Sequence, residues 1–258
     1  MPIGVFDSGI GGLTVFREIA KHFPKTDLYY LGDTARVPYG NKSPETVIRY
    51  SLECGNYLYN FGIDALVIAC NTASSYALDI LRKELDIPVV GVVEPGVDLA
   101  LRITRNGKIG IIGTQGTVKS QSYQNLLLEK ADVEVYQKAC PLFVPLVEEG
   151  MIDNHIAKMV VKEYLDELIE KGIDTLILGC THYPLLKDTI KKLYPHINIV
   201  DSSQAITEYL KKHHIPKNET GLRKIFITDE SPAFEKLKSL LIGNIPVEKL
   251  ELSQICSL

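Results

Sequence analysis

The stretch GIDALVIACNT at residues 62–72 returns as GIDTLILGCTH at residues 172–182. Both copies begin with Gly-Ile-Asp, continue through an apolar run and reach a cysteine, Cys70 in the first and Cys180 in the second. The apolar run is typical of a buried strand of a parallel sheet, and the glycine is typical of the loop that precedes such a strand. Ordinary loop chemistry therefore explains the glycine and the strand, but it does not explain the shared cysteine.

Apolar runs alternate with amphipathic stretches along the chain, as in DLYYLG followed by PETVIRYSLECGNYLYNF, and KIGIIG followed by VKSQSYQNLLLEK. Strands that alternate with helices of this length predict an α/β fold with parallel sheets. The repeat extends loosely to IGVFDSG at 3–9 and IGIIGTQG at 109–116. We therefore predict two similar domains related by pseudo-twofold symmetry, each a parallel sheet flanked by helices. The first comprises residues 1–97 and 207–258, and the second comprises residues 98–206.

Composition limits the classes of partner. The chain has 258 residues, of which 45% are hydrophobic, so it can bury a substantial core. Its net charge of -4 and the lack of a long block of like charge disfavour nucleic acid or an anionic membrane as a partner, and we expect a small molecule instead. No apolar stretch approaches the ~20 residues of a membrane span, and the N-terminus does not resemble a secretion signal. We expect a cytoplasmic protein.

The cysteines do not form a pattern typical of disulfides or zinc. There are five of them, and none is spaced as Cys-x-x-Cys. An odd number without a secretion signal disfavours a disulfide framework, and the spacing disfavours a structural metal site. We interpret Cys54, Cys140 and Cys256 as structural, because none of them directly follows a predicted strand.

Polar residues gather where the predicted strands end. They are Asp7, Ser8, Tyr39, Gly40, Asn71, Thr72, Thr114, Thr117, Thr181 and His182. Ligands of open parallel sheets bind beyond the carboxyl ends of the strands, and helix N-termini at this edge favour an anion. Each residue taken singly is explained as a helix cap, but their number predicts a binding site. The run GIGG at 9–12 does not predict nucleotide binding, because Thr14 stands where the third glycine of the dinucleotide pattern belongs.

Cys70 and Cys180 are the candidate chemical groups. Each follows a predicted strand and precedes a predicted helix, where amide dipoles lower the pKa of a thiol. A single cysteine in this position is more often a packing residue. Two thiols delivered by two facing domains, however, are suited to inverting a stereocentre, since one removes a proton and the other returns one from behind. The alternatives are a redox dithiol or, together with His182, a metal site.

Three further residue types are candidates for acid or base roles. Asp7 ends the first predicted strand, where an N-cap role is the alternative. Glu148 and Glu149 follow the apolar run PLFVPLV, where a solvated turn is the alternative. His182 could cap a helix or carry a proton, since its ordinary pKa lies near neutral pH.

Five motifs, FDSGIGGLT, LGDTARVPYGN, ACNTAS, CPLFVPLVEEG and LGCTHYPLL, occur in this order. Together they closely resemble the glutamate racemase family, whose members are cofactor-independent enzymes of the aspartate/glutamate racemase superfamily. The resemblance runs along nearly the whole chain and weakens after about residue 205. It implies an active site between two α/β domains, commonly in a homodimer, that interconverts L- and D-glutamate for peptidoglycan synthesis without a cofactor or metal.

The resemblance also implies roles for single residues. Cys70 and Cys180 would be the two acid/base residues, acting on the D and the L enantiomer respectively, with Asp7, Glu148 and His182 assisting them. The substrate contacts it implies are Asp7, Ser8, Tyr39, Gly40, Asn71, Thr72, Thr114, Thr117, Thr181 and His182. Aspartate racemases of the superfamily tend to carry a glutamate at the position of His182, which favours glutamate as the substrate. A decarboxylase or another racemase of the superfamily is the alternative, although the presence of both cysteines disfavours a one-thiol decarboxylase.

Overall fold

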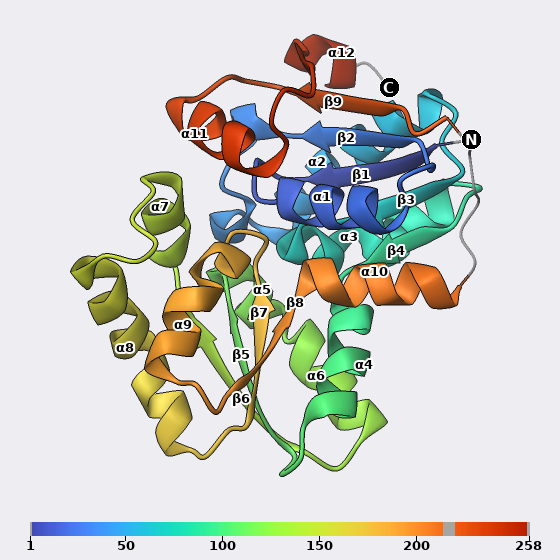
Figure 1. Cartoon of the computed structure of the whole chain (residues 1–258). Helices are drawn as coiled ribbons and strands as arrows, with labels where there is room; N and C mark the ends of the chain where they lie inside the picture. Colours follow the sequence, from blue (N-terminus) through green and yellow to red (C-terminus); the bar gives the residue numbers. More distant parts are fainter. Residues whose placement is uncertain (1, 214–219, 257–258) are drawn as a thin grey trace.

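The computed structural model describes residues 2–213 and 220–256, which form two parallel sheets, the larger one above the smaller one in Figure 1. The six-stranded sheet contains β1 (Ile3–Asp7), β2 (Leu28–Gly32), β3 (Ala65–Ile68), β4 (Val89–Gly91), β9 (Arg223–Ile227) and β10 (Val247–Lys249). The four-stranded sheet contains β5 (Lys108–Gly113), β6 (Glu134–Ala139), β7 (Thr175–Gly179) and β8 (Asn198–Asp201). None of the helices in the described ranges is both long and apolar enough to cross a membrane.

The helices follow the strands in regular alternation. They are α1 (Leu13–His22), α2 (Pro44–Asn60), α3 (Asn71–Glu84), α4 (Val93–Ile103), α5 (Gln115–Ser120), α6 (Ser122–Lys130), α7 (Phe143–Glu148), α8 (His155–Glu170), α9 (Lys187–Leu193), α10 (Ser202–Lys212), α11 (Pro232–Leu241) and α12 (Leu252–Cys256). Short 3-10 helices lie at η1 (Thr34–Arg36), η2 (Tyr39–Asn41) and η3 (Tyr183–Leu186).

The two sheets repeat one strand order. The larger sheet runs β10-β9-β2-β1-β3-β4, and the smaller runs β6-β5-β7-β8. In each, the second strand lies beside the first, the third lies on the first strand's other side, and the fourth follows the third. All pairings are parallel. The predicted α/β class with two similar parallel-sheet halves is therefore confirmed, and β3 and β7, which precede the two cysteines, are equivalent strands.

The repeated Gly-Ile-Asp has a packing explanation. Gly62 and Gly172 follow α2 and α8 with φ of 72° and 79°, a left-handed conformation that ends each helix. The next residues, Ile63 and Ile173, are buried against glycines of the neighbouring strands. A Cβ added at Gly4 would lie 2.7 Å from the Ile63 Cδ1, and one at Gly110 would lie 2.6 Å from the Ile173 Cδ1. The same isoleucine-on-glycine contact therefore joins β1 to β3 and β5 to β7.

Three buried clusters form the core. Helices α2 and α3 cover one face of the larger sheet, and α4 and α6 cover one face of the smaller. A third cluster runs from α1 and α11, on the other face of the larger sheet, to α8 and α9 on the smaller. Helix α10 contacts both α1 and α4 and lies between the two sheets in Figure 1. The predicted boundaries near 97 and 207 fall within α4 and α10.

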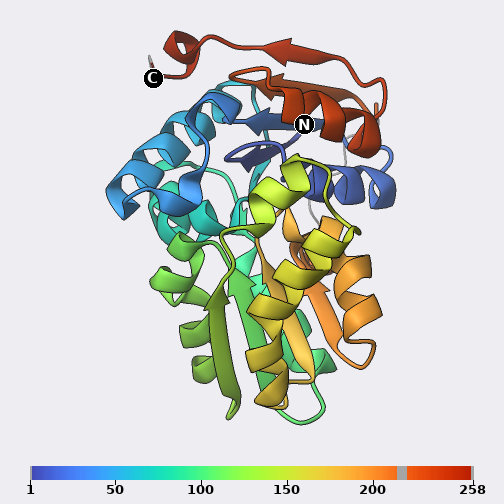
Figure 2. The same cartoon turned by 90° about the vertical axis from the view of Figure 1, so that its left-hand side faces the viewer.

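The sequence pattern missed some elements. Strands β4, β8 and β10 are only three or four residues long, and β6 is a partly exposed edge strand of sequence EVYQKA without an apolar run. The expected helix over VKSQSYQNLLLEK is instead two helices, α5 and α6. They are separated at Gln121, whose φ of 55° is left-handed. The C-terminal segment, red in Figure 2, returns to the outer edge of the larger sheet through β9 and β10.

We predict that Gly62→Ala lowers the free energy of unfolding by about 1–2 kcal/mol, because a Cβ is unfavourable at a left-handed φ. Apart from Gly62 and its two chain neighbours, no described residue has an atom within 4 Å of the added Cβ, so mainly the backbone conformation is tested. Denaturant unfolding measures the change. Gly62→Asn is the control and should lose less, since asparagine tolerates this conformation better. Equal stability of the alanine variant and the unmodified chain would contradict the explanation.

Candidate active site

A cavity of about 40 Å³ lies where the carboxyl ends of the two sheets face each other. Its lining residues come from both sheets. They are Ser8, Val37, Pro38, Tyr39, Gly40, Cys70, Asn71, Thr72, Thr114, Val144, Glu148, Gly179, Cys180, Thr181 and His182. The residues after β1 and β3 therefore meet the residues after β5 and β7, which are the equivalent adjacent strand pairs of the two sheets.

Three sequence-predicted residues do not line the cavity. Asp7 is fully buried and contacts Thr181, a lining residue, through a hydrogen bond of 3.3 Å from the Thr181 hydroxyl. Thr117 is also buried, and its hydroxyl lies 3.1 Å from the hydroxyls of Thr72 and Thr114. Asp7 and Thr117 therefore support lining residues instead of facing the cavity. The third residue, Glu149, pairs with Lys236, and every other candidate site residue is in the lining.

The lining also includes Pro38, which belongs to the strand-end run Pro38-Tyr39-Gly40. Three further lining residues were not expected from the sequence: Val37, Val144 and Gly179. Val144 could have been found from its spacing, because it precedes Glu148 by four residues on α7 and so lies on the same helix face. Val37 belongs to the same loop as Tyr39 and Gly40, but it is apolar and nothing in its chemistry indicates a site residue.

Cys70 lies at the start of α3. Its sulfur accepts a hydrogen bond of 3.4 Å from the Ala73 N–H and thereby caps the helix. Burial raises the pKa of the Cys70 thiol to about 12, and the Asp7 carboxylate adds to this, while hydrogen bonds from Ser8 and Ala73 oppose it. The expectation that the helix start lowers the pKa of this thiol is therefore wrong for Cys70, because desolvation outweighs the amide contribution.

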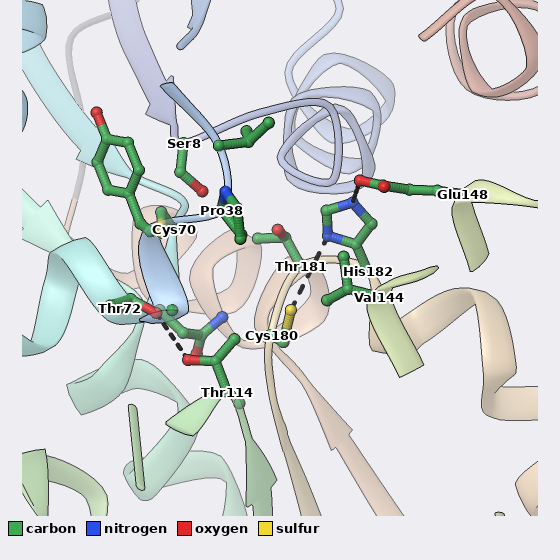
Figure 3. Close-up of a pocket in the computed structure, with 15 residues that line it drawn as sticks. Ser8, Pro38, Cys70, Thr72, Thr114, Val144, Glu148, Cys180, Thr181 and His182 are labelled. Atoms are coloured by element: carbon green, nitrogen blue, oxygen red, sulfur yellow. Dashed lines mark hydrogen bonds and ion pairs between the residues drawn. The ribbon is translucent and has the colours of Figure 1, made fainter. Parts of the chain in front are cut away.

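The surroundings of Cys180 differ from those of Cys70. Its sulfur lies 3.9 Å from the His182 Nδ1, and the His182 Nε2 lies 3.2 Å from a Glu148 carboxylate oxygen. Figure 3 shows this chain of Cys180, His182 and Glu148 on one side of the cavity, with Cys70 and Ser8 on the other. Burial alone lowers the pKa of His182, but the hydrogen bonds and charges of Cys180 and Glu148 outweigh it and raise the pKa to about 10. These contacts therefore favour the protonated imidazole.

Asp7 stabilises the loop that follows β1 through a hydrogen bond to its backbone. One carboxylate oxygen accepts a hydrogen bond of 3.0 Å from the Gly9 N–H, and the other accepts the Thr181 hydroxyl. Burial raises the pKa of Asp7, while the His182 charge and the hydrogen bonds of Gly12, Gly9 and Thr181 oppose the rise. Asp7 thus connects the first strand of one sheet to the loop after the third strand of the other.

The two halves also touch through small and polar side chains. The Thr72 hydroxyl lies 2.9 Å from that of Thr114, a contact that Figure 3 marks between the two sheets. Asn71 donates to Ser202 at 3.1 Å and accepts from the Tyr123 hydroxyl at 2.6 Å. These side chains pair with one another across the cavity wall.

Glycines allow this close approach. A Cβ on Gly11 would lie 2.4 Å from the Thr181 hydroxyl oxygen, and one on Gly40 would lie 2.5 Å from the Thr114 Cβ. Gly11, in the run GIGG at 9–12, therefore allows close contact between the two halves.

Cys70 and Cys180 are free thiols, as are the other three cysteines. Across residues 2–213 and 220–256, no group of three or more His, Cys, Asp or Glu side chains is placed to hold a metal ion. His182 is instead engaged with Cys180 and Glu148.

Comparison with known proteins gives a consistent picture. Residues 3–210 match the family model described as Asp/Glu/Hydantoin racemase. The glutamate racemase of Persephonella marina is 69% identical over 259 residues and covers 100% of both chains. The crystal structure of glutamate racemase isoform RacE1 from Bacillus anthracis is 39% identical, with a TM-score of 0.92 over 97% of both chains. That of Francisella tularensis glutamate racemase in complex with D-glutamate is 35% identical, with a TM-score of 0.86 over 97% of both chains.

We predict that His182 is doubly protonated at pH 8. ¹⁵N NMR of histidine-labelled protein should show an imidazolium signal at this pH that is absent in His182→Gln. Glu148→Gln should lower the pKa of His182, because the carboxylate stabilises the imidazolium. Glu149→Gln, which changes an exposed neighbour, should leave it unchanged.

The same shift has a consequence for stability. The folded-state pKa of His182 is about 10, above the ordinary value of 6.5. The contribution of the protonated His182 to the stability of the fold is therefore fully present below about pH 6.5. It is lost as the pH rises through the folded-state pKa. A neutral His182 at pH 8 would contradict the raised pKa.

Proposed function

Because this chain belongs to the Asp/Glu/Hydantoin racemase family, we propose that it interconverts L- and D-glutamate. It is an isomerase of the amino-acid racemase class. The observation that carries the proposal is the placement of the two thiols. Cys70 and Cys180 follow equivalent strands of two similar sheets and line one cavity from its two sides (Figure 3).

The proposed reaction is a proton transfer at the Cα of the amino acid. With L-glutamate, the Cys180 thiolate takes the proton and the electron pair of the C–H bond stays on the carbon. The Cys70 thiol then gives its proton to the opposite face, which produces D-glutamate and leaves Cys70 as the thiolate. With D-glutamate the two cysteines exchange roles.

The surroundings of the two thiols suit these roles. The His182 imidazole lies 3.9 Å from the Cys180 sulfur, beside the group that takes the Cα proton from L-glutamate. Glu148 holds this imidazole in place, which makes Glu148 and His182 assisting residues. On the other side, burial keeps Cys70 protonated, ready to donate. Asp7 assists there, since its charge acts on Cys70 and its carboxylate fixes the loop that carries Ser8.

An amino-acid Cα–H is very weakly acidic, so the site must stabilise the negative charge that develops. Donors held rigidly in a water-poor cavity do this most effectively. Helix α3 starts at the cavity, since Cys70, Asn71 and Thr72 are lining residues. The N-terminus of a helix carries a partial positive charge, which favours a negative charge that develops beside it. Hydroxyl and amide groups of both halves surround the same space.

We propose that the substrate is held by Ser8, Tyr39, Gly40, Asn71, Thr72, Thr114, Thr181 and His182, with Asp7 and Thr117 acting through their neighbours. Asn71, Thr72 and Thr114 now bond across the two halves, so the ligand would take over these hydrogen bonds. The D-glutamate in the Francisella tularensis glutamate racemase structure supports glutamate as the ligand. No cofactor or metal is needed in this scheme, because the two thiols supply both proton-transfer groups.

The cellular setting is proposed from the family resemblance. We infer a cytoplasmic homodimer that supplies D-glutamate for peptidoglycan synthesis, built of the domains 1–97 with 207–258 and 98–206. Residues 1, 214–219 and 257–258 of the first domain lie outside the described residues. Light scattering tests the dimer, and growth of a bacterium that requires D-glutamate tests the role in the cell wall.

We expect the purified chain to racemise L-glutamate in D₂O without added cofactor, with deuterium appearing at Cα. Each turnover exchanges the Cα proton with a thiol that equilibrates with solvent. Optical rotation and ¹H NMR measure the two events. The kcat/KM for glutamate should exceed that for aspartate, and the reverse order would refute the substrate assignment.

Cys70→Ser and Cys180→Ser should each abolish racemisation, because a serine hydroxyl is too weakly acidic to replace a thiol at neutral pH. Elimination from a glutamate analogue that carries a leaving group needs only one base. Cys70→Ser should therefore retain elimination from the L form, and Cys180→Ser from the D form.

Cys140→Ser is the matched control, since Cys140 is buried but does not line the cavity. An unchanged thermal transition excludes misfolding. The two-thiol mechanism fails if either serine variant still racemises glutamate, or if both variants prefer one enantiomer.

A further inference from the structure

The loop between β2 and α2 forms one wall of the cavity through Val37, Pro38, Tyr39 and Gly40. Its other end does not face the cavity. It lies against the carboxyl end of β9, which pairs with β2 in the larger sheet. The loop is therefore held between the site and a strand from the C-terminal part of the chain.

Thr228, directly after β9, binds this loop through its hydroxyl group, which both donates and accepts a hydrogen bond. The hydroxyl donates a hydrogen bond of 3.0 Å to an oxygen of Asp33 and accepts one of 2.8 Å from the Ala35 N–H. The next residues add a second pair of bonds, since Thr34 donates to the Asp229 carbonyl at 2.6 Å and accepts from the Asp229 N–H at 2.7 Å. Thr228 is buried, and the contacts join residues 193 to 195 positions apart.

Asp33 transmits this contact to the cavity wall. It is fully buried, and its second oxygen accepts hydrogen bonds from the Tyr39 hydroxyl at 2.5 Å and from the Arg36 Nε at 2.6 Å. The Arg36 guanidinium is fixed in turn, because it lies 4.0 Å above the Tyr50 ring and pairs with Glu53. The Tyr39 hydroxyl is thus bound within this cluster, and its position depends on the orientation of the Asp33 carboxylate.

We propose that Thr228 is a positioning residue for the racemase reaction, through which the C-terminal strand β9 sets the loop carrying Tyr39 and Gly40. The proposal rests on the proposed function. Thr228 lies beyond residues 3–210, the part of the chain that matches the family model. It contacts no cavity-lining residue directly in the bonds described, and it acts through Asp33 and the Ala35 amide. Losing the hydroxyl would leave a buried carboxylate oxygen and an amide short of a partner and allow the loop to shift.

The test compares Thr228→Val with Thr228→Ser and Thr207→Val. Valine keeps the shape of threonine but removes the hydroxyl, and serine restores it. Thr207 is an equally buried threonine whose hydroxyl bonds only within α10, to the Ser203 carbonyl, so Thr207→Val measures the general effect of losing a buried hydroxyl. Thr34→Val removes the hydrogen bonds between Thr34 and Asp229, which join the same loop to the residues after β9. This variant replaces Thr228→Val in the test if Thr228→Val does not fold.

Steady-state kinetics with L-glutamate should show kcat/KM reduced about tenfold or more in Thr228→Val, since small misplacements of a site wall have effects of this size. Thr228→Ser and Thr207→Val should remain near the unmodified protein, and Thr34→Val should show a smaller loss than Thr228→Val. A purely structural role would lower the Tm of Thr228→Val while leaving kcat and KM unchanged at 25 °C, and that result would overturn the proposal.

Hydrogen exchange of the segment 33–42 provides a readout that does not need activity. Exchange should be faster in Thr228→Val, because the Ala35 N–H loses its acceptor, and serine should restore protection. An unmodified chain that does not racemise glutamate would overturn the proposed function, whereas unchanged exchange in Thr228→Val would overturn the role of Thr228.

Discussion

Parallel strands bring all their carboxyl ends, and the helix starts that follow them, to one edge of a sheet. In this molecule two such edges face each other, and the polar ends of β1 and β3 meet those of β5 and β7. Each edge alone would lie open to water. Facing one another, they enclose hydroxyls, thiols and the buried Asp7 carboxylate. The hydrogen bond between Asp7 and Thr181 and the high pKa of Cys70 both depend on this enclosure.

The scaffold is repeated, but the chemistry around the thiols is not. Matching isoleucine-on-glycine contacts place β3 and β7 alike against their neighbours. Cys70 then lies near an aspartate from an adjacent strand of its own sheet, whereas Cys180 lies next to a histidine two residues away and a glutamate supplied by α7. One thiol thus has a carboxylate nearby, and the other has an imidazole. A reaction that runs in both directions does not require identical bases, since each thiol is the base in one direction only.

The sequence predicts the parts of the molecule that depend on local patterns. Continuous apolar runs identify β1, β2, β3, β5, β7 and β9, and the strand-end polar residues identify most of the cavity lining. Edge strands such as β6 were missed because one side of them faces water and their residues are mixed. The division between α5 and α6 was missed because a glutamine, Gln121, takes the left-handed conformation that glycine usually marks.

The remaining features depend on contacts between distant residues. The raised pKa of Cys70 results from burial between two halves, which the sequence near Cys70 does not indicate. Thr228 is an ordinary threonine after a strand, and its relation to Asp33 appears only when β9 lies beside β2. Val144 lines the cavity but has no polar or reactive group, so a search for reactive side chains does not find it.

The contact between Thr72 and Thr114 makes the two halves compete with any ligand for the same hydrogen bonds. A ligand held by these two threonines must therefore first break the contact between them. The affinity that is measured then equals the intrinsic affinity reduced by the free energy of breaking that contact. A compound that bonded to neither hydroxyl would leave the contact intact and would avoid this cost.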